Sequence, residues 1–348
     1  MITIQDIADA AGVSKGTVSY VLSGKHRKVK ISDATCARIQ RLARDMGYRA
    51  NTLARDVSTG DSRFMGFLAG GGKSDFVQAI LDGMQSELDP RGYSLRLLHL
   101  PPQPGEADYE RLLDTALGYR LAGLVCHSVS RGVLLRLQRE FAAHDVPLGI
   151  VSNSYLPRGA LHVGSNDAHG VALAVEHLAG LGHRRIACIT LSPGSPFALA
   201  RQRGFRRGMA ACGLTVRAMD WIEERGGATV ACTRALALLR TEIAPTALVC
   251  DGDTLALGLM SFLGHERIQT PEDVSVVGFG NFGFGTHVVP TLTTVYEPFR
   301  EMGQAMAQAM LSAATGVTAG DAAFARRRIL DTHLIVRDST GRPRRGAE

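Results

Sequence analysis

The sequence predicts a small all-α helix-turn-helix unit followed by a larger α/β core. Three observations lead to this fold class. Residues 3–24 contain two short amphipathic helix patterns joined by a tight turn, and from Arg63 onward apolar strand patterns alternate with helical ones. The basic excess of the chain is concentrated in its first sixty residues. At 348 residues the chain has room for two or three domains with cores of their own.

The first helix is predicted to begin after Thr3 and to end at Gly12. Thr3 and Asp6 have the spacing of a capping box, and a glycine is the residue that most often ends a helix. Between Thr3 and Gly12, apolar residues recur at helical spacing, at Ile4, Ile7, Ala8 and Ala11. These residues are therefore expected to form the buried face of the helix.

The second helix is predicted to begin after Ser14 and to bury Val18, Val21 and Leu22. Its other face is small, polar and basic, as in helices that helix-turn-helix proteins place in the major groove of DNA. The alternative is an ordinary helical hairpin with a solvated face. The candidate DNA-binding residues in and just after this helix are Lys15, Gly16, Thr17, Ser19, Tyr20 and Ser23.

A third amphipathic helix is predicted from Ser32 to Gly47, with Ile39, Leu42, Ala43 and Met46 inside. The basic loop 25–30 precedes it and is expected near the DNA backbone. A compact three-helix unit results, which favours the helix-turn-helix reading over the plain hairpin.

The charge distribution agrees with a DNA-binding first unit. Residues 1–60 contain ten Lys and Arg against five Asp and Glu, a net charge of +5, whereas the remainder contains 29 against 28, a net of +1. Neutralising phosphates with release of counterions requires such a local basic excess. A solvated basic surface would have the same composition, so charge alone supports the reading only weakly.

Neither the cysteines nor any apolar run points to a metal site, a secreted protein or a membrane protein. Cys36, Cys126, Cys188, Cys212, Cys232 and Cys250 form no CxxC pair, and most lie in apolar runs. We expect them to be reduced and buried in a cytoplasmic protein. No signal-peptide pattern and no membrane-spanning run is present, and neither a metal nor a cofactor is expected.

Beyond Arg63 the alternation of strands and helices predicts parallel sheets covered by helices. The predicted strands are Phe64–Ala69, Ser94–His99, Gly123–His127, Leu148–Ser152, Arg185–Thr190, Ala247–Cys250 and Val274–Phe279. The predicted helices are Phe76–Leu88, Ala107–Leu117, Val133–Ala142, Ala168–Leu181, Ala200–Ala211, Val230–Leu239 and Leu255–Leu263.

Two glycine-rich stretches imitate nucleotide-binding motifs. GFLAGGGKS at 66–74 resembles a phosphate-binding P-loop, but the position that requires the first glycine is Phe67. GFGNFG at 278–283 matches GxGxxG, yet no convincing helix pattern follows it. No HExxH, GxSxG or Ser-His-Asp spacing is present, so no catalytic residue is assigned.

Seven stretches of the sequence resemble the lactose-repressor (LacI/GalR) family of bacterial transcription regulators. They are TIQDIADAAGVSKGTVS, MGYRAN, NTLARDV, AVEHLAGLGHRRIACI, PEDVSVVGF, PTLTTVYEP and LIVRDST. The resemblance covers nearly the whole chain. It implies an all-α helix-turn-helix headpiece plus an α/β periplasmic-binding-protein-like core of two Rossmann-like subdomains, with an effector in the crevice between them.

The resemblance also implies the domain boundaries. The headpiece is expected at residues 1–48, a hinge segment at 49–62, the effector-binding and dimerisation core at 63–339 and a tail at 340–348. Within the core, the N-subdomain is expected at about 63–163 and 291–318. The C-subdomain is expected at about 164–290 and 319–339.

In the family, the hinge segment becomes helical on operator DNA and inserts an apolar wedge into the minor groove. The matching residues here are Asn51, Ala54 and Val57, where Val57 replaces the usual leucine. In the headpiece, Thr17 and Ser19 match phosphate contacts. Tyr20 stands where most members carry arginine, so the common operator sequence is not expected to carry over.

The effector site implied by the resemblance departs from the family in several places. Arg201, before Gly204-Phe205, matches the family's effector-binding arginine, and Asp253 of an Asn-Asp pair remains. The usual polar partners are replaced by Ser152, Gly252 and Gly280, which Asn281 follows. Lys73 and Phe76 complete the expected site, which comprises Lys73, Phe76, Ser152, Arg201, Gly252, Asp253, Gly280 and Asn281.

The expected crevice lacks carboxylates that the family carries but keeps Arg201 and Lys73, so its charge is more positive. A positive crevice favours an anionic effector such as a sugar acid or sugar phosphate. A decayed pocket, or one for a bulky neutral ligand, is the alternative. The function expected overall is a homodimeric repressor on a pseudo-palindromic operator, controlled by a small effector. The competing class is a small-molecule receptor or enzyme that merely carries a DNA-binding-like headpiece.

Overall fold

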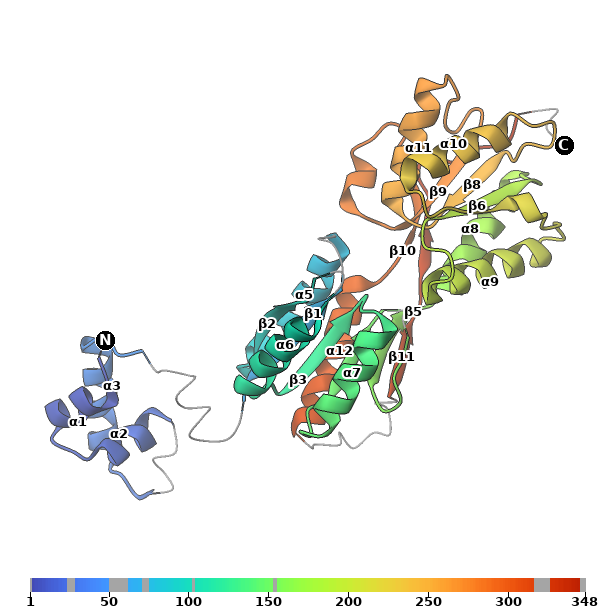
Figure 1. Cartoon of the computed structure of the whole chain (residues 1–348). Helices are drawn as coiled ribbons and strands as arrows, with labels where there is room; N and C mark the ends of the chain where they lie inside the picture. The colour runs from blue at the N-terminus through green and yellow to red at the C-terminus, as the bar shows by residue number, and fades with distance from the viewer. Residues whose placement is uncertain are drawn as a thin grey trace. The chain divides into compact units, whose positions relative to one another are not determined.

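The computed structural model describes residues 2–23, 29–49, 62–70, 75–101, 104–152, 155–315 and 326–344. The chain divides into two compact units, Met1–Ser62 and Arg63–Glu348, which Figure 1 colours from blue onward along the chain. Among the predicted site residues, Asn51, Ala54, Val57 and Lys73 lie outside the described residues.

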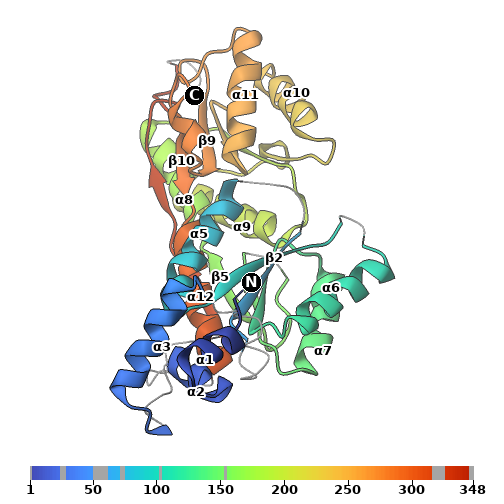
Figure 2. The same ribbon diagram turned by 90° about the vertical axis from the view of Figure 1, so that its left-hand side faces the viewer.

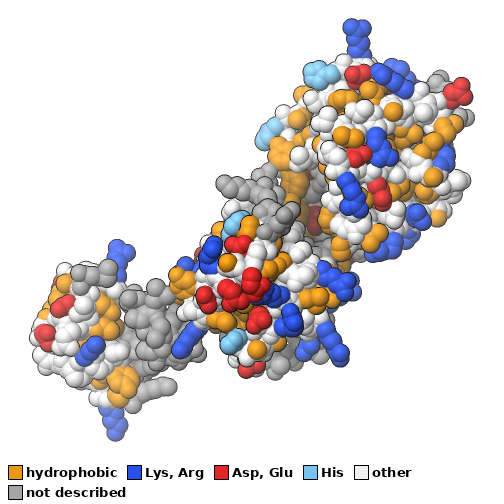
Figure 3. Space-filling view, in the orientation of Figure 1, with side chains coloured by type: hydrophobic (Ala, Val, Ile, Leu, Met, Phe, Trp, Pro, Cys, Tyr) orange, Lys and Arg blue, Asp and Glu red, His pale blue; other side chains and the backbone are white. Residues whose placement is uncertain are grey.

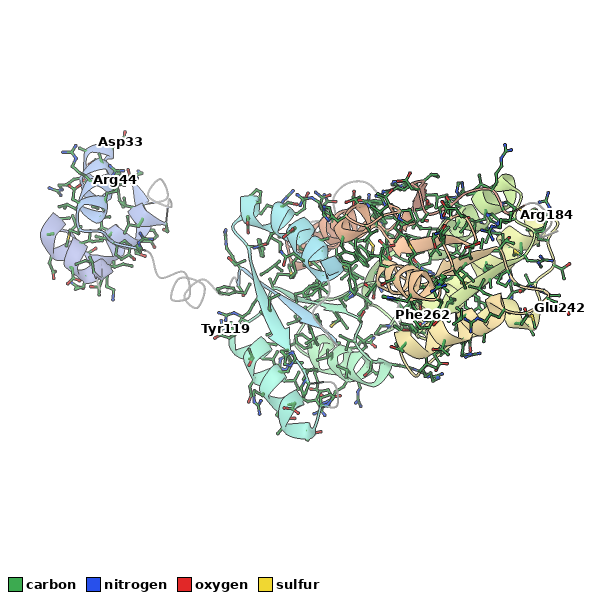
Figure 4. All side chains as sticks on the ribbon, turned by 90° about the horizontal axis from the view of Figure 1, so that it is seen from above. Asp33, Arg44, Tyr119, Arg184, Glu242 and Phe262 are labelled. Atoms are coloured by element: carbon green, nitrogen blue, oxygen red, sulfur yellow. The ribbon has the colours of Figure 1, made fainter. Side chains whose placement is uncertain are left out.

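The first unit contains three helices, α1 (Ile4–Ala11), α2 (Lys15–Leu22) and α3 (Asp33–Asp45). The expected caps are present: Thr3 and Asp6 form a capping box, Ser14 and Ser32 cap α2 and α3, and Gly12 ends α1 at φ 62°. Figure 4 marks Asp33 and Arg44 near the two ends of α3. The helices enclose one apolar core of Ile7, Ala8, Ala11, Val18, Val21, Cys36, Ile39 and Ala43.

The second unit is built on two six-stranded sheets. The first has the order β11-β5-β4-β3-β1-β2 and is parallel throughout, and the second has the order β12-β10-β9-β8-β6-β7, with only β12 antiparallel to its neighbour. The strands are β1 (Phe64–Ala69), β2 (Ser94–His99), β3 (Gly123–His127), β4 (Leu148–Val151), β5 (Leu161–Ser165), β6 (Ile186–Thr190), β7 (Trp221–Glu223), β8 (Ala247–Cys250), β9 (Ser275–Gly280), β10 (Thr293–Tyr296), β11 (Arg327–Leu330) and β12 (His333–Ile335).

Helices cover both faces of each sheet, as Figure 2 shows. Four apolar cores result: α5 and α12 cover one face of the first sheet and α6 and α7 the other, while α8 and α9 cover one face of the second sheet and α10 and α11 the other. The helices are α5 (Asp75–Leu88), α6 (Glu106–Gly118), α7 (Arg131–Ala142), α8 (Asp167–Leu181), α9 (Pro196–Ala211), α10 (Ala228–Leu239), α11 (Asp253–His265) and α12 (Phe299–Thr315).

Glycines allow two of these helix pairs to pack closely. A Cβ on Gly204 of α9 would fall on the backbone carbonyl of Ala168 in α8, and a Cβ on Gly303 of α12 would fall on the carbonyl of Ile80 in α5. Both helix pairs can therefore pack this closely only because glycine has no side chain at these positions.

The chain passes between the two sheets three times, after β5, after β10 and after β11. Two of these passages differ from the boundaries expected from the sequence. Strand β10 pairs with β9 in the second sheet, so residues 293–296 belong to the C-subdomain and not to the N-subdomain segment 291–318. Strand β11 pairs with β5, so residues 327–330 belong to the N-subdomain and not to the C-subdomain segment 319–339.

The cysteines are all free; Cys212 is half-buried and the others are buried. Within the described ranges, no helix is long and apolar enough to cross a membrane, and no group of His, Cys, Asp and Glu is arranged to hold a metal ion.

Candidate DNA-binding surface and effector site

The outward face of α2 carries the predicted DNA-binding residues. Val18 and Val21 are buried, whereas Lys15, Gly16 and Ser19 are exposed and Tyr20 is 43% exposed. The hydroxyl of Thr17 is 2.9 Å from that of Ser14, and the Thr17 N–H donates to Ser14 Oγ at 3.1 Å. Ser23 follows the last turn as its C-cap. The helix thus presents a polar face with one aromatic side chain.

Both basic and acidic side chains are spread over the core on the face that Figure 3 shows. Acidic side chains gather there over α6, whose sequence contains Glu106, Asp108, Glu110 and Asp114. Arg136 of α7 is paired with two of them, at 2.5 Å to Glu106 and 3.1 Å to Glu110. An acidic surface disfavours contact with phosphate, so α6 itself is not expected to bind DNA.

Arg201, the predicted effector-binding arginine, lies in a buried network of charges. Its Nε donates to Asp167 Oδ2 at 3.2 Å, one Nη donates to Glu297 Oε2 at 3.4 Å and the other donates to the backbone carbonyl of Asp251. Its guanidinium also lies 3.7 Å from the ring centroid of Phe279. The arginine is 8% exposed, and its donors are directed at protein groups.

The two carboxyl groups of this network also share one hydroxyl. Ser165 Oγ lies 2.6 Å from Asp167 Oδ1 and 2.7 Å from Glu297 Oε1. A hydroxyl has one proton and can donate to only one of them. The second contact therefore requires a proton on a carboxyl group, which then donates to Ser165. This proton also leaves the buried cluster with one positive and one negative charge.

Glu297 is the carboxyl group that fits this role. Burial and the nearby charge of Asp167 raise its pKa to about 7, against the opposing effects of Arg201 and the Ser165 hydrogen bond. Glu297 lies two residues before Phe299, the first residue of α12, and Asp167 opens α8. The network therefore joins two of the three passages between the sheets.

Asp253, also predicted for the effector site, is fully buried and serves the backbone. It accepts from Thr294 Oγ1 at 2.5 Å and from the Phe282 N–H at 2.7 Å. Burial raises the pKa of Asp253 despite these hydrogen bonds. Gly252 is the N-cap residue of α11 and supplies no side-chain cap. In this arrangement Asp253 fixes the loop after β9.

Gly280 and Asn281 shape that loop. Gly280 has φ 124°, and a Cβ there would lie 2.9 Å from the Phe282 ring, so only glycine leaves room for the ring. Asn281 has φ 55°, and its Oδ1 accepts from Arg337 at 2.7 Å. The position at which family members carry an aspartate is thus filled by an aromatic ring.

Phe282 belongs to an aromatic cluster that joins the two subdomains. Phe76 of α5 stacks on Phe282 with ring centroids 6.0 Å apart, and it also contacts Phe299 at 5.3 Å and His127 at 5.2 Å. Phe284 lies 5.7 Å from Phe282. Of the predicted effector residues, the structure therefore brings Phe76, Asp253 and Gly280 together around Phe282.

Ser152 directly follows β4, beside two histidines. Its carbonyl accepts from His162 Nε2 at 2.9 Å, and Val151 before it contacts His127 Nδ1 at 2.7 Å. The Ser152 hydroxyl is buried and has no hydrogen-bond partner among the described residues. Burial lowers the pKa of both His127 and His162, so both rings are expected to be neutral near pH 7.

These contacts correct the charge balance expected for the crevice. The sequence predicts Arg201 as a cation without carboxylate partners, because the aspartates expected at 152 and 280 are absent. The structure supplies Asp167 and Glu297 instead, so the positive charge of Arg201 is compensated within the protein. Arg201 is not a free anion-binding group in this arrangement.

The residues that the sequence did not indicate are Ser165, Asp167, Glu297, Phe282 and His127. The signal that could have indicated Glu297 is its place as the single acid between the β-branched run TTVY and Pro298, and for Asp167 it is its place at the start of an apolar helix. That Asp167 and Glu297 lie together could not be predicted, because they are 130 positions apart in the sequence. They come together only because the chain passes between the two sheets at both places.

Of the two stretches that resemble nucleotide-binding motifs, the structure describes one completely and the other only in part. GFGNFG lies at the end of β9 and is followed by a four-residue 3-10 turn, Gly283–Thr286, and not by the helix that a dinucleotide site requires. In the P-loop-like stretch, residues 71–74 lie outside the described residues.

The chain is similar to known regulatory proteins along most of its length. A model for bacterial regulatory proteins of the lacI family matches residues 3–51, and one for a periplasmic binding protein-like domain matches residues 175–340. The HTH-type transcriptional repressor PurR of Vibrio cholerae serotype O1 (strain M66-2) is 32% identical over 309 residues, covering 87% of this chain and 89% of that protein. PurR of Vibrio atlanticus (strain LGP32) is 30% identical over 307 residues, with the same two coverages.

Solved structures with the same fold include the lac repressor dimer bound to operator and the anti-inducer ONPF, with a TM-score of 0.82 and 22% identity over 98% of this chain and 99% of that chain. The complex of the transcriptional regulator CelR with cellobiose has a TM-score of 0.69 and 25% identity, covering 97% of this chain and all of that chain (100%). The relatives named are transcriptional repressors and regulators. The identity to PurR over most of both chains, with the family-model match to the headpiece, shows that this chain belongs to the lacI family of bacterial regulatory proteins and is a transcription regulator, not an enzyme.

Proposed function

We propose that this protein is a homodimeric transcriptional repressor that binds a pseudo-palindromic operator, with an affinity set by a small molecule held between its two core subdomains. The observation that carries the DNA part is the outward face of α2, on which Lys15, Thr17, Ser19 and Tyr20 are polar or accessible while the valines are buried. As a DNA-binding regulator of this family, it is expected to act in the cytoplasm, on the nucleoid.

Tyr20 is the residue we expect to set operator preference. A phenol offers one hydroxyl and an apolar face, whereas arginine offers two parallel donors to guanine. Thr17 and Ser19 are expected to bind phosphates and to position α2. The hinge residues Asn51, Ala54 and Val57 are proposed to bind the minor groove between the two half-sites.

A second copy of the chain is the partner proposed for the outer face of α11. A groove of about 550 Å³ lies there, lined by Leu257, Met260 and Ile268 together with Val288 and Val289. Val289 is 99% exposed, which is unusual for a β-branched apolar residue. Two such surfaces related by a twofold axis would cover both valines and would set two headpieces at equivalent half-sites.

The effector site is proposed at the aromatic cluster of Phe76, His127 and Phe282, where the two subdomains meet. Aromatic faces with a few fixed polar groups, here the Ser152 hydroxyl and the amide of Asn281, are typical of small-ligand sites. A ligand that separates Phe76 from Phe282 would change the angle between the subdomains. The anionic class of effector loses its main support at this site, because Arg201 is already paired with two carboxyl groups.

The decisive experiment is selection of DNA sequences by the full chain, followed by fluorescence anisotropy on the selected site. A dimer is expected to select a sequence with two inverted half-sites and to lose affinity steeply with added salt. Selection of no consensus, with binding independent of salt, would instead favour a small-molecule receptor with an inactive headpiece.

A thermal-shift screen then tests the effector. Neutral sugars, sugar acids, sugar phosphates and flat heterocycles would be compared on the parent, Phe76→Ala and Arg201→Ala. Stabilisation that is lost in Phe76→Ala supports the aromatic site. Stabilisation by an anion alone that is lost in Arg201→Ala but kept in Phe76→Ala would restore the anionic proposal.

A further inference from the structure

A second pocket lies on the first passage between the subdomains, away from the aromatic cluster. It has a volume of about 300 Å³. His162 of β5 and Arg327 of β11 line it from the N-subdomain, and Pro196 and Arg203 of α9 line it from the C-subdomain. Phe76, Arg201, Asp253 and Asn281 are not among the residues that line it.

The pocket is positively polarised. The first turns of α8 and α9, at Ala168 and Pro196, both open on it, and these helices have 15 and 16 residues. Arg203 and Arg327 are exposed and form no ion pair with any residue that the structure describes. The one carboxylate in the lining, Asp167, is already bound by Arg201 and Ser165.

His162 adds a buried polar atom without a partner. The side chain is 5% exposed, and Nδ1 has no hydrogen-bond partner among the described residues. Its Nε2 lies 2.9 Å from the Ser152 carbonyl. Because a carbonyl oxygen can only accept, Nε2 must carry the proton, and Nδ1 of the neutral ring is then an acceptor. A ligand that satisfies it must supply a donor such as a hydroxyl.

We propose that this pocket binds a small anion that also carries a hydroxyl group, of the class of polyol phosphate esters and hydroxy acids. The anionic group binds Arg203 and Arg327 near the positive ends of the α8 and α9 dipoles, and the hydroxyl donates to His162 Nδ1. Because the cationic groups come from both subdomains, the ligand stabilises the arrangement that keeps both halves of the pocket together. This site is distinct from the aromatic effector site and does not depend on it.

The test is isothermal titration calorimetry of the full chain with glycerol 3-phosphate, inorganic phosphate and glycerol at constant ionic strength. We expect saturable binding of glycerol 3-phosphate, weaker binding of inorganic phosphate and none of glycerol. The double variant Arg203→Gln/Arg327→Gln should lose about tenfold or more in affinity. Arg207→Gln, an exposed arginine on α9 that does not line the pocket, is the matched control and should bind as the parent does.

His162→Phe keeps a ring of similar size and removes the acceptor. It should reduce the preference for glycerol 3-phosphate over inorganic phosphate while it retains phosphate binding. Absence of saturable binding to the parent, or equal affinity in the parent and the double arginine variant, would overturn the proposal. Operator binding by the same preparation separates the two questions, since a chain that binds DNA but no anion refutes only this inference.

Discussion

The carboxyl groups of Asp167 and Glu297 contact the same hydroxyl group, that of Ser165, at 2.6 and 2.7 Å. One residue opens α8 and the other precedes α12, so a single shared proton links two chain passages between the subdomains. Arg201 binds the outer oxygens of both, which keeps the cluster electrically balanced when that proton is present.

The stability of the core should therefore depend on pH through Glu297. The folded state raises its pKa from 4.5 to about 7, so between these values the folded chain holds a proton that the unfolded chain has lost. For this group, the free energy of unfolding falls as pH rises through that range, by about 1.4 kcal/mol per pH unit. Glu297→Gln is neutral at every pH and should lack this contribution.

Urea unfolding at about pH 5.5 and about pH 7.5 measures this contribution of Glu297 to the free energy of unfolding. The difference between Glu297→Gln and the parent should shift in favour of the variant as pH rises. Glu242→Gln, an exposed residue labelled in Figure 4, is the control and should leave the pH dependence unchanged. A constant difference between Glu297→Gln and the parent would contradict the shared-proton assignment.

Thr17 and Tyr20 should affect operator binding in different ways. Thr17→Ala removes a proposed phosphate contact and should weaken binding to all sites alike, by about 1 kcal/mol. Tyr20→Arg should change the preferred base in each half-site. The consensus sequence selected by each variant tests the change in preferred base, and anisotropy titrations test the loss of affinity. An unchanged consensus for Tyr20→Arg would show that this residue does not face the groove.

Close packing of α8 and α9 should make Gly204 intolerant of a side chain. In Gly204→Ala the new Cβ would overlap the Ala168 carbonyl, and overpacking of this kind costs about 1–3 kcal/mol or more. Gly180→Ala on α8 meets nothing within 4 Å and should stabilise the helix by about 0.5–1 kcal/mol. Thermal unfolding of the two variants should therefore shift in opposite directions; equal shifts would refute the packing argument.

Association of two chains through the α11 groove should depend on Val289. A carboxylate in place of this exposed valine would be buried without a partner, so Val289→Asp should raise the dimer dissociation constant by about tenfold or more. Val336→Asp, at a valine that is 56% exposed and lies outside the groove, is the matched control. Analytical ultracentrifugation gives the constants, and dimers of equal strength would place the interface elsewhere.

Much of the fold could be predicted from local pattern. The strands Phe64–Ala69, Ser94–His99, Gly123–His127 and Ala247–Cys250 are those observed. All but the edge strand Ser94–His99 are buried, and buried parallel strands are short apolar runs bounded by turns. The short edge strands β7, β11 and β12 were not predicted, and neither were the inner strands β5 and β10 or the helix α12. In β11 the residues Arg327 and Arg328 are exposed and give no apolar run, so its position follows from pairing with β5 and not from composition.

The outward face of α2 was predictable from the sequence, and the partners of Arg201 were not. Caps and helical spacing are local, so Ser14, Val18 and Val21 fix which face of α2 points outward. The partners of Arg201 come from two other segments, and their identity depends on how the chain passes between the sheets. A substitution pattern at 152, 252 and 280 shows which groups are lost from a site, but not which distant groups replace them.

The strand order has a consequence for synthesis of the protein on the ribosome. The first unit is complete once about sixty residues have emerged, so it can fold long before the rest. Both sheets of the core, by contrast, obtain their last strand from residues 327–335. Neither half of the core can be completed by a nascent chain that ends earlier, so a truncated product would present a folded headpiece on an unfinished core.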